Sequence, residues 1–123
     1  MMKRTVLNPD WGVSTCCEVD NLVFIGHHAG HTKDGNKLFT IEEQTEETFR
    51  NLKTTLDTID LTFGDIVSVN VLLRNISDFN GMHSIWQKWF PNEYPCRTTL
   101  TTDFVDAHCL IQVNAVAYRT HEA

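Results

Sequence analysis

Apolar and polar residues alternate over six short segments of the chain, which predicts six β-strands. The segments are rich in β-branched and aromatic residues and lie at residues 3–7, 13–19, 21–26, 65–74, 97–104 and 109–118. The long β-branched segment 65–74 is expected in the interior of the sheet. A stretch with Asp-Gly and Gly-Asn steps, residues 30–36, predicts an exposed loop after the third strand.

Two further segments have apolar residues at helical spacing. The first helix is predicted over about residues 41–58, because Thr40 and Glu43 fit a capping box at its start. The second is expected to be capped by Ser77-Asp78 and to end before Pro91. Their apolar faces consist of Phe49, Leu52, Leu56 and Ile59 in the first helix and of Phe79, Met82, Trp86, Trp89 and Phe90 in the second.

The resulting order is β-β-β-α-β-α-β-β, which predicts an α+β domain over residues 1–123, with two helices on one face of a mixed sheet. In the last strand, one set of alternate residues is apolar and is expected under the helices: Ile111, Val113, Ala115 and Ala117. The other set is half apolar and half amide: Leu110, Gln112, Asn114, Val116 and Tyr118. This second face is too apolar for open solvent, so a partner subunit is expected to cover it.

Composition and charge narrow the function classes. The 123 residues carry 10 Lys and Arg against 16 Asp and Glu, a formal charge of −6. Because no basic cluster exists beyond Lys3-Arg4, a nucleic-acid partner is disfavoured. No run of about 18 apolar residues predicts a membrane span, and no apolar stretch behind Lys3-Arg4 predicts a signal peptide, so a cytoplasmic protein is expected.

Cysteines and histidines are the remaining metal-ligand candidates. The four cysteines, Cys16, Cys17, Cys96 and Cys109, form no C-x-x-C pair and are expected to be small buried hydrophobes. His27, His28 and His31 lie within five residues, but neighbours on a strand face opposite sides, so no metal site is expected.

Seven short motifs occur in the order and spacing of one known family. They are residues 21–25 (NLVFI), 51–56 (NLKTTL), 65–71 (DIVSVNV), 78–80 (DFN), 89–91 (WFP), 95–98 (PCRT) and 111–117 (IQVNAVA). From about residue 10 to residue 118 the chain resembles the Rid (YjgF) family, also called L-PSP endoribonuclease or translation-inhibitor proteins. The resemblance implies a two-layer, chorismate-mutase-like fold and a homotrimer whose sheets line a central barrel.

The resemblance also implies three clefts between subunits, each of which binds a small carboxylate without a cofactor. Well-characterised members hydrolyse enamine and imine intermediates, such as 2-aminoacrylate, to 2-keto acids and ammonia. Arg97 matches the arginine that binds the substrate carboxylate, and a guanidinium fork suits that group. Backbone groups near Thr99 are expected to assist it. Ser14 keeps a family serine, and His83, where the family often has asparagine, is a further candidate for the cleft.

Two departures from the family bear on catalysis. Gln112 and Asn114 replace two glutamates, the second of which is thought to position or activate the attacking water, and an amide orients water without accepting a proton. The family's Ser-Gly-Gln is replaced by a segment that contains His27, which is expected to line the cleft near Arg97 and to act as the base. Two functions therefore stay open: an imine hydrolase that uses His27 or Asn114, and a non-catalytic carboxylate-binding or metabolite-sensing trimer. Endoribonuclease activity is less favoured.

Overall fold

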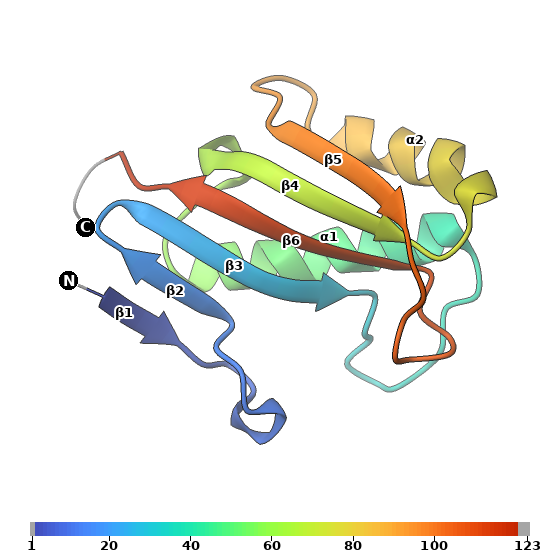
Figure 1. Ribbon diagram of the computed structural model, residues 1–123, viewed down its shortest axis with the longest axis horizontal. Coiled ribbons are helices and arrows are strands. Elements are labelled where there is room, and N and C mark those ends of the chain that lie inside the picture. Colours follow the sequence, from blue (N-terminus) through green and yellow to red (C-terminus); the bar gives the residue numbers. More distant parts are fainter. Residues whose placement is uncertain (1, 121–123) are drawn as a thin grey trace.

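The computed structural model describes residues 2–120, which form a six-stranded sheet with two helices packed on one face (Figure 1). The strands are β1 (Met2–Thr5), β2 (Cys16–Val19), β3 (Leu22–Ala29), β4 (Ile66–Leu73), β5 (Cys96–Thr101) and β6 (Ile111–Tyr118). The helices are α1 (Ile41–Thr58) and α2 (Phe79–Trp89), and single 3-10 turns occur at η1 (Pro9–Trp11), η2 (Phe63–Asp65) and η3 (Ile76–Asp78). The predicted α+β class and element order are confirmed.

The strand order in the sheet is β1-β2-β3-β6-β4-β5. Only β4 and β5 pair in parallel, and α2 is the crossover that a parallel pair requires. The C-terminal strand β6 inserts between β3 and β4 and pairs antiparallel with both. The sheet is therefore mixed, as expected, and β4 is an interior strand.

The two helix starts differ from each other. At α1 the capping box is present, because the amide of Glu43 donates to Thr40 Oγ1 at 3.1 Å and the amide of Thr40 donates to Glu43 Oε1 at 3.3 Å. At α2 the predicted side-chain cap is wrong. Asp78 makes no capping hydrogen bond, and the turn η3 leads directly into the helix. The turn η3 supplies the local hydrogen bonds that a cap would otherwise make.

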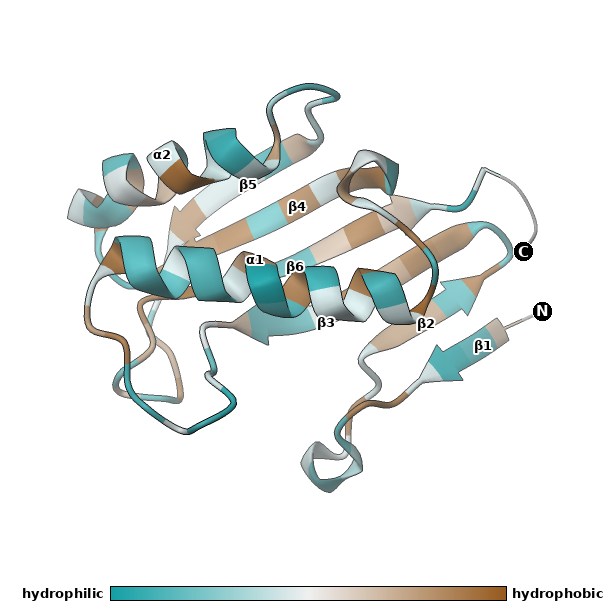
Figure 2. Cartoon of the chain, turned by 180° about the vertical axis from the view of Figure 1, so that it is seen from behind, coloured by the Kyte–Doolittle hydropathy of each residue, from teal (hydrophilic) through white to brown (hydrophobic). Residues whose placement is uncertain are grey.

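The core lies between the sheet and the two helices (Figure 2). Val69, Val71 and Ile111 point toward the helices and are fully buried, as are Phe49 and Leu52 of α1. Around Phe49 an aromatic cluster joins both helices and the turn η2, and it consists of Phe49, Phe63, Trp86, Trp89 and Phe90. This packing fixes α2 beside α1 and so sets the position of the residues that α2 presents to β5.

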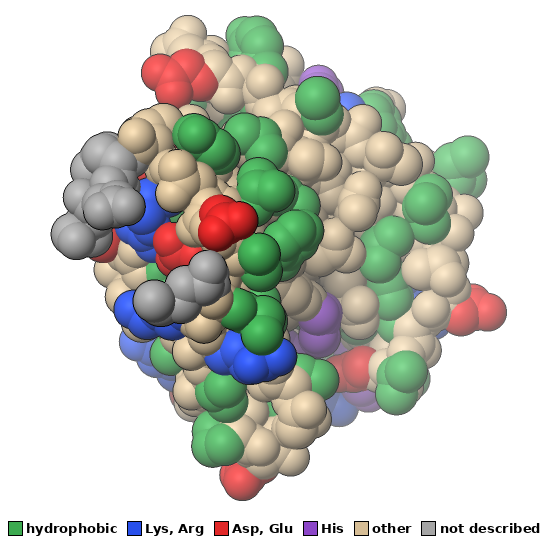
Figure 3. Space-filling view, turned by 60° about the vertical axis from the view of Figure 1, so that its left-hand side comes forward, with side chains coloured by type: hydrophobic (Ala, Val, Ile, Leu, Met, Phe, Trp, Pro, Cys, Tyr) green, Lys and Arg blue, Asp and Glu red, His purple; other side chains and the backbone are tan. Residues whose placement is uncertain are grey.

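The other face of the sheet is open and keeps apolar side chains exposed. Leu22, Phe24 and Tyr118 are 43%, 47% and 42% exposed, and Leu100 on β5 is 46% exposed. Apolar side chains are spread over the surface in Figure 3, with histidine side chains between them. A surface of this kind is typical of an interaction site. No helix in the described part of the chain is long and apolar enough to cross a membrane.

Candidate functional site

Arg97 lies on β5 and faces the helix side of the sheet, because its register partner on β4 is the buried Val69. Its guanidinium carbon lies 4.7 Å from the ring centre of Trp86 and 5.4 Å from that of Phe79. Its Nη1 donates to Nδ1 of His83 at 3.0 Å. These three partners occur at helical spacing along α2, so a single helix face holds the arginine in place.

The contact with Arg97 determines which ring nitrogen of His83 carries the proton. A guanidinium can only donate hydrogen bonds, so Nδ1 of His83 accepts and its proton is on Nε2. The His83 ring also stacks on Phe79, with ring centres 5.5 Å apart and planes 10° apart. His83, a candidate from the sequence, is therefore a direct positioning partner of Arg97 in this chain.

The charge of Arg97 has no counter-ion among the residues that the structure describes. The ion pairs that the structure records are Arg50 with Glu46, Lys53 with Asp57, and Arg119 with Glu18. Among residues 2–120, no carboxylate lies within 4.0 Å of the Arg97 guanidinium. Partial burial lowers the pKa of Arg97 from its ordinary value, which shows that the cation is partly desolvated. A half-buried guanidinium that has no carboxylate partner is chemically suited to an anion.

A hollow of about 690 Å³, here called the arginine hollow, opens beside this guanidinium. Its walls come from α2, from the turn after it and from the start of β5. They consist of His83, Trp86, Gln87, Phe90, Pro91, Tyr94, Pro95 and Arg97. Arg97 carries the only permanent charge among them.

A second hollow of about 460 Å³, here called the histidine hollow, lies between η1, β3 and α1. Trp11, His27 and His31 form a cluster there, with ring centres 5.7 to 6.4 Å apart. Ser14 lines the same hollow. The pKa of His27 is lowered, first by burial and then by the neighbouring His31 and His28, so its ring is neutral at neutral pH.

A β-bulge brings His27 to the level of Asn114. Ile25 pairs with Ala115 and His28 pairs with Val113, so Gly26 and His27 together oppose the single residue Asn114 of β6. Asn114 lies on the open face, where its Oδ1 accepts from Nδ2 of Asn70 at 2.9 Å. The bulge was not predicted from the sequence, although a glycine inside a strand is its usual signal.

His28 has a structural role. Its Nδ1 lies 2.9 Å from the carbonyl oxygen of Gly26, which can only accept, so Nδ1 carries the proton. Its Nε2 lies 2.7 Å from the hydroxyl of Thr55 on α1 and accepts from it. Burial lowers the pKa of His28, which favours this neutral state. Within residues 2–120, no three His, Cys, Asp or Glu side chains are arranged to hold a metal ion.

The expectation that His27 lies near Arg97 is not met within one chain. β6 and β4 lie between β3 and β5, a separation of about 14 Å at the usual strand spacing. Ser14 and His27 line the histidine hollow, whereas His83 and Arg97 line the arginine hollow. Thr99 is on the same side of β5 as Arg97, and Asn114 is on the opposite face of the sheet. The candidate residues therefore fall into two separate groups within one chain.

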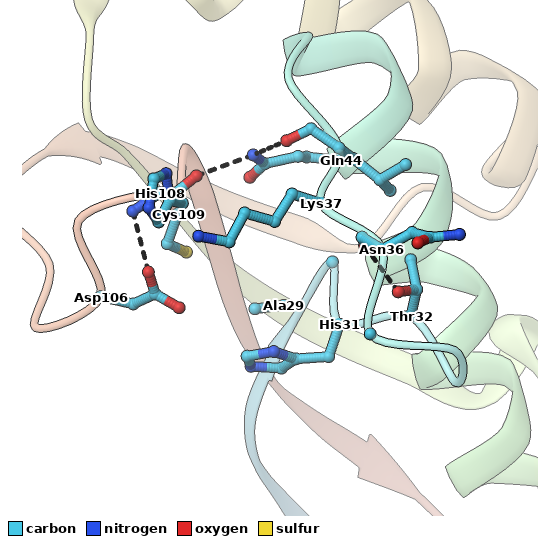
Figure 4. Close-up of a pocket in the computed structure, with 12 residues that line it drawn as sticks. Ala29, His31, Thr32, Asn36, Lys37, Gln44, Asp106, His108 and Cys109 are labelled. Atoms are coloured by element: carbon cyan, nitrogen blue, oxygen red, sulfur yellow. Dashed lines mark hydrogen bonds between the residues drawn. The ribbon is translucent and has the colours of Figure 1, made fainter.

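A third hollow, of about 210 Å³, lies between the loop after β3 and the loop before β6 (Figure 4). Gln44 of α1 ties these loops together: its Nε2 donates to the carbonyl oxygens of Leu38 and His108, both at 2.8 Å. Its Oε1 accepts from the amide of Leu110 at 2.7 Å. Because this buried amide has its hydrogen-bonding groups occupied by backbone, its role is to hold the loops. Sequence reasoning missed it, and the only signal was a polar residue within an apolar helix face.

The comparisons with known proteins agree with this fold. The family model described as Endoribonuclease L-PSP matches residues 8–119. A 2-iminobutanoate/2-iminopropanoate deaminase of Dermatophagoides farinae is 22% identical over 105 residues, which cover 84% of this chain and 82% of that protein. The Homo sapiens protein of the same name is 25% identical over 101 residues, 80% of this chain and 74% of that protein. A solved structure of a YjgF-family protein from Neisseria meningitidis has a TM-score of 0.87 at 15% identity and covers 99% of this chain and 98% of that one.

The sheet, the two helices and these structural neighbours define an α+β protein with the chorismate-mutase-like fold. Its arginine hollow is suited to a small anion. The chain belongs to the Endoribonuclease L-PSP family, which is the Rid (YjgF) family that its motifs resemble.

Proposed function

We propose that this protein binds small 2-keto and 2-imino acids through Arg97 and hydrolyses reactive enamine and imine intermediates. The unpaired guanidinium of Arg97 is the observation that carries the proposal, because a carboxylate is the counter-ion that its planar fork fits best. The relatives named as 2-iminobutanoate/2-iminopropanoate deaminases support the imino-acid substrate class.

The active assembly in this proposal is a homotrimer, as the family resemblance implies. The apolar open face around Phe24, Val116 and Tyr118 supports it, since a partner subunit would remove these side chains from water. In such a trimer the histidine hollow of one subunit meets the arginine hollow of its neighbour. The two hollows of one chain then belong to two different clefts.

The chemistry needs one water and no redox step. Arg97 holds the substrate carboxylate, and water adds to the carbon of the C=N bond. The resulting carbinolamine loses ammonia and leaves the 2-keto acid. In the first form of the proposal, neutral His27 accepts the proton of the attacking water and returns it to the nitrogen that leaves as ammonia, and its lowered pKa keeps it available for that role. In the second form, Asn114 only orients the water, and Asn114→Glu raises the rate because it supplies a base.

Replacement of Arg97 by lysine tests the proposal, because lysine keeps the charge and loses the fork. The readouts are the shift of melting temperature by 2-oxobutanoate and the rate of ammonia release from 2-iminobutanoate generated in situ. The wild type is expected to show both, and Arg97→Lys is expected to lose the shift and most of the rate. Arg50→Lys is the matched control, since Arg50 is an exposed residue paired only with Glu46. Equal shifts in all three proteins would exclude Arg97 as the carboxylate site.

A non-catalytic carboxylate-binding trimer is the second candidate. It is favoured by the amides Gln112 and Asn114, which leave β6 without the glutamates of the family's deaminases. Binding of 2-oxobutanoate without ammonia release above the uncatalysed rate would select it. Cleavage of RNA, suggested only by the family description, is disfavoured by the charge of −6.

A further inference from the structure

The lining of the arginine hollow is unusual in its chemistry. Beside the guanidinium, most of its wall consists of aromatic and proline side chains, Trp86, Phe90, Pro91, Tyr94 and Pro95, and His83 and Gln87 are the remaining polar members. It contains no carboxylate and no second Lys or Arg. Its volume of about 690 Å³ is several times that of the smallest keto acids. A site for very small polar acids alone would need neither this width nor this apolar surface.

The contacts of Arg97 determine how a ligand enters. Trp86 and Phe79 stack on the guanidinium, and His83 takes one of the Nη1 hydrogens. In the described chain the other N–H groups of Arg97 have no recorded acceptor, so a carboxylate binds at that remaining edge. Because Arg97 itself lines the hollow, the substituent on the next carbon of the ligand extends along the aromatic wall.

We propose that the substrates are 2-imino monocarboxylic acids with an aromatic or bulky apolar side chain, which packs against Trp86, Phe90 and Tyr94. This inference rests on the proposed function and names its substrate class. A second carboxylate on the ligand would find no cation in the wall, and a cationic side chain would find no acid. Apolar contact and ring stacking are the interactions that Trp86, Phe90 and Tyr94 offer, and the remaining polar side chains of the hollow are the uncharged Gln87 and His83, whose Nδ1 is occupied by Arg97.

Tyr94 is the specificity-determining residue in this arrangement. Trp86 and Phe90 are 6% and 2% exposed, and their rings lie 4.3 Å apart within the core cluster, so they also support the fold. Tyr94 is 77% exposed and lies in the turn after α2, directly before Pro95. Its ring contributes to the hollow with little role in the core, so Tyr94→Ala is expected to fold normally.

Titration calorimetry with phenylpyruvate, pyruvate and 2-oxoglutarate tests the inference on the wild type. Phenylpyruvate is expected to bind at least about tenfold more tightly than pyruvate, since it adds an aromatic ring to the same carboxylate contact. 2-Oxoglutarate is expected to bind no more tightly than pyruvate. In Tyr94→Ala the phenylpyruvate-to-pyruvate affinity ratio is expected to fall about fivefold or more. Phe39→Ala is the matched control, because Phe39 is 75% exposed and lies outside the hollow, and it is expected to keep the ratio.

The outcomes separate this inference from the proposed function. Equal affinities for phenylpyruvate and pyruvate, both lost in Arg97→Lys, would overturn the inference and leave the carboxylate site intact. A preference for phenylpyruvate that Tyr94→Ala does not change would also overturn it, and so would tightest binding of 2-oxoglutarate. If the wild type binds none of the three acids, the proposed function itself fails.

Discussion

The arginine hollow and the histidine hollow differ in the charge and in the acid–base chemistry of the side chains that line them. The first has a permanent cation stacked on Trp86 and Phe79, with no acid beside it. The second has the imidazoles of His27 and His31, and burial lowers the pKa of His27, which keeps its ring neutral at neutral pH. A permanent cation is suited to hold a carboxylate, and a neutral imidazole is suited to accept a proton.

The two hollows also lie at different places in the sheet. Two strands lie between them, so within one chain Arg97 and His27 line different hollows. Under the trimer proposal, assembly is therefore a condition for catalysis, because only a neighbouring subunit supplies the missing half.

The largest expected effect comes from preventing assembly. Phe24→Glu places a carboxylate on the open face, opposite Val116, and is expected to yield a chain of 14.1 kDa in light scattering with imine hydrolysis at the uncatalysed rate. Phe39→Glu, at an exposed position outside the sheet, is the control and is expected to stay assembled and active. Full activity in a monomeric Phe24→Glu protein would show that one chain contains a complete site.

The next effect concerns the histidine hollow alone. His27→Gln is expected to lower kcat by about a hundredfold, the low end for loss of a general base, with the affinity for 2-oxobutanoate unchanged. In the wild type, kcat is expected to fall as the pH decreases through the pKa of His27, which burial places below 6.5. An unchanged kcat in His27→Gln would leave Asn114 as the group that orients the water. In that case Asn114→Glu is expected to raise the rate of imine hydrolysis, because it supplies a base.

A mixing experiment examines whether the two hollows form one cleft. Arg97→Ala and His27→Gln subunits, unfolded and refolded together in equal amounts, are expected to recover about a quarter of the wild-type rate. A cleft is intact only when one specific subunit supplies Arg97 and its neighbour supplies His27, which occurs in about one cleft in four for random assembly. Each variant refolded alone is the control. No recovery in trimers shown by native mass spectrometry to be mixed would place the two residues in separate sites.

The smallest effect concerns the support of the histidine hollow. His28→Asn removes the bond to Thr55 and is expected to lower the free energy of unfolding at pH 7.5 by about 1–3 kcal/mol. Since the pKa of His28 is lower in the folded chain than in the unfolded one, its contribution is complete above about pH 6.5 and is lost as the pH falls. Urea unfolding at pH 7.5 and pH 5.0 is expected to show a smaller difference between the two pH values in the variant than in the wild type. An equal difference would assign the pH dependence to other groups.

The sequence by itself determined the elements and singled out Arg97 as the candidate anion-binding residue. Helix α1 starts at its capping box, because Thr40 and Glu43 interact within a single helical turn. Buried and partly exposed side chains alternate along β6, because one face of the strand packs on the helices and the other face is open. Arg97 was identified from its flanking motif, and its lack of a counter-ion then became visible in the structure. The cap at Ser77-Asp78 was mistaken, since a 3-10 turn meets the same local requirement.

Only the tertiary structure decided which functional residues lie together. The insertion of β6 between β3 and β4 joins segments that are far apart along the chain, and no local pattern records that pairing. The same pairing creates the bulge that brings His27 level with Asn114 and separates both from Arg97. Strand order depends on the free energy of packing the whole sheet against α1 and α2, so it follows from the complete chain and not from any one segment.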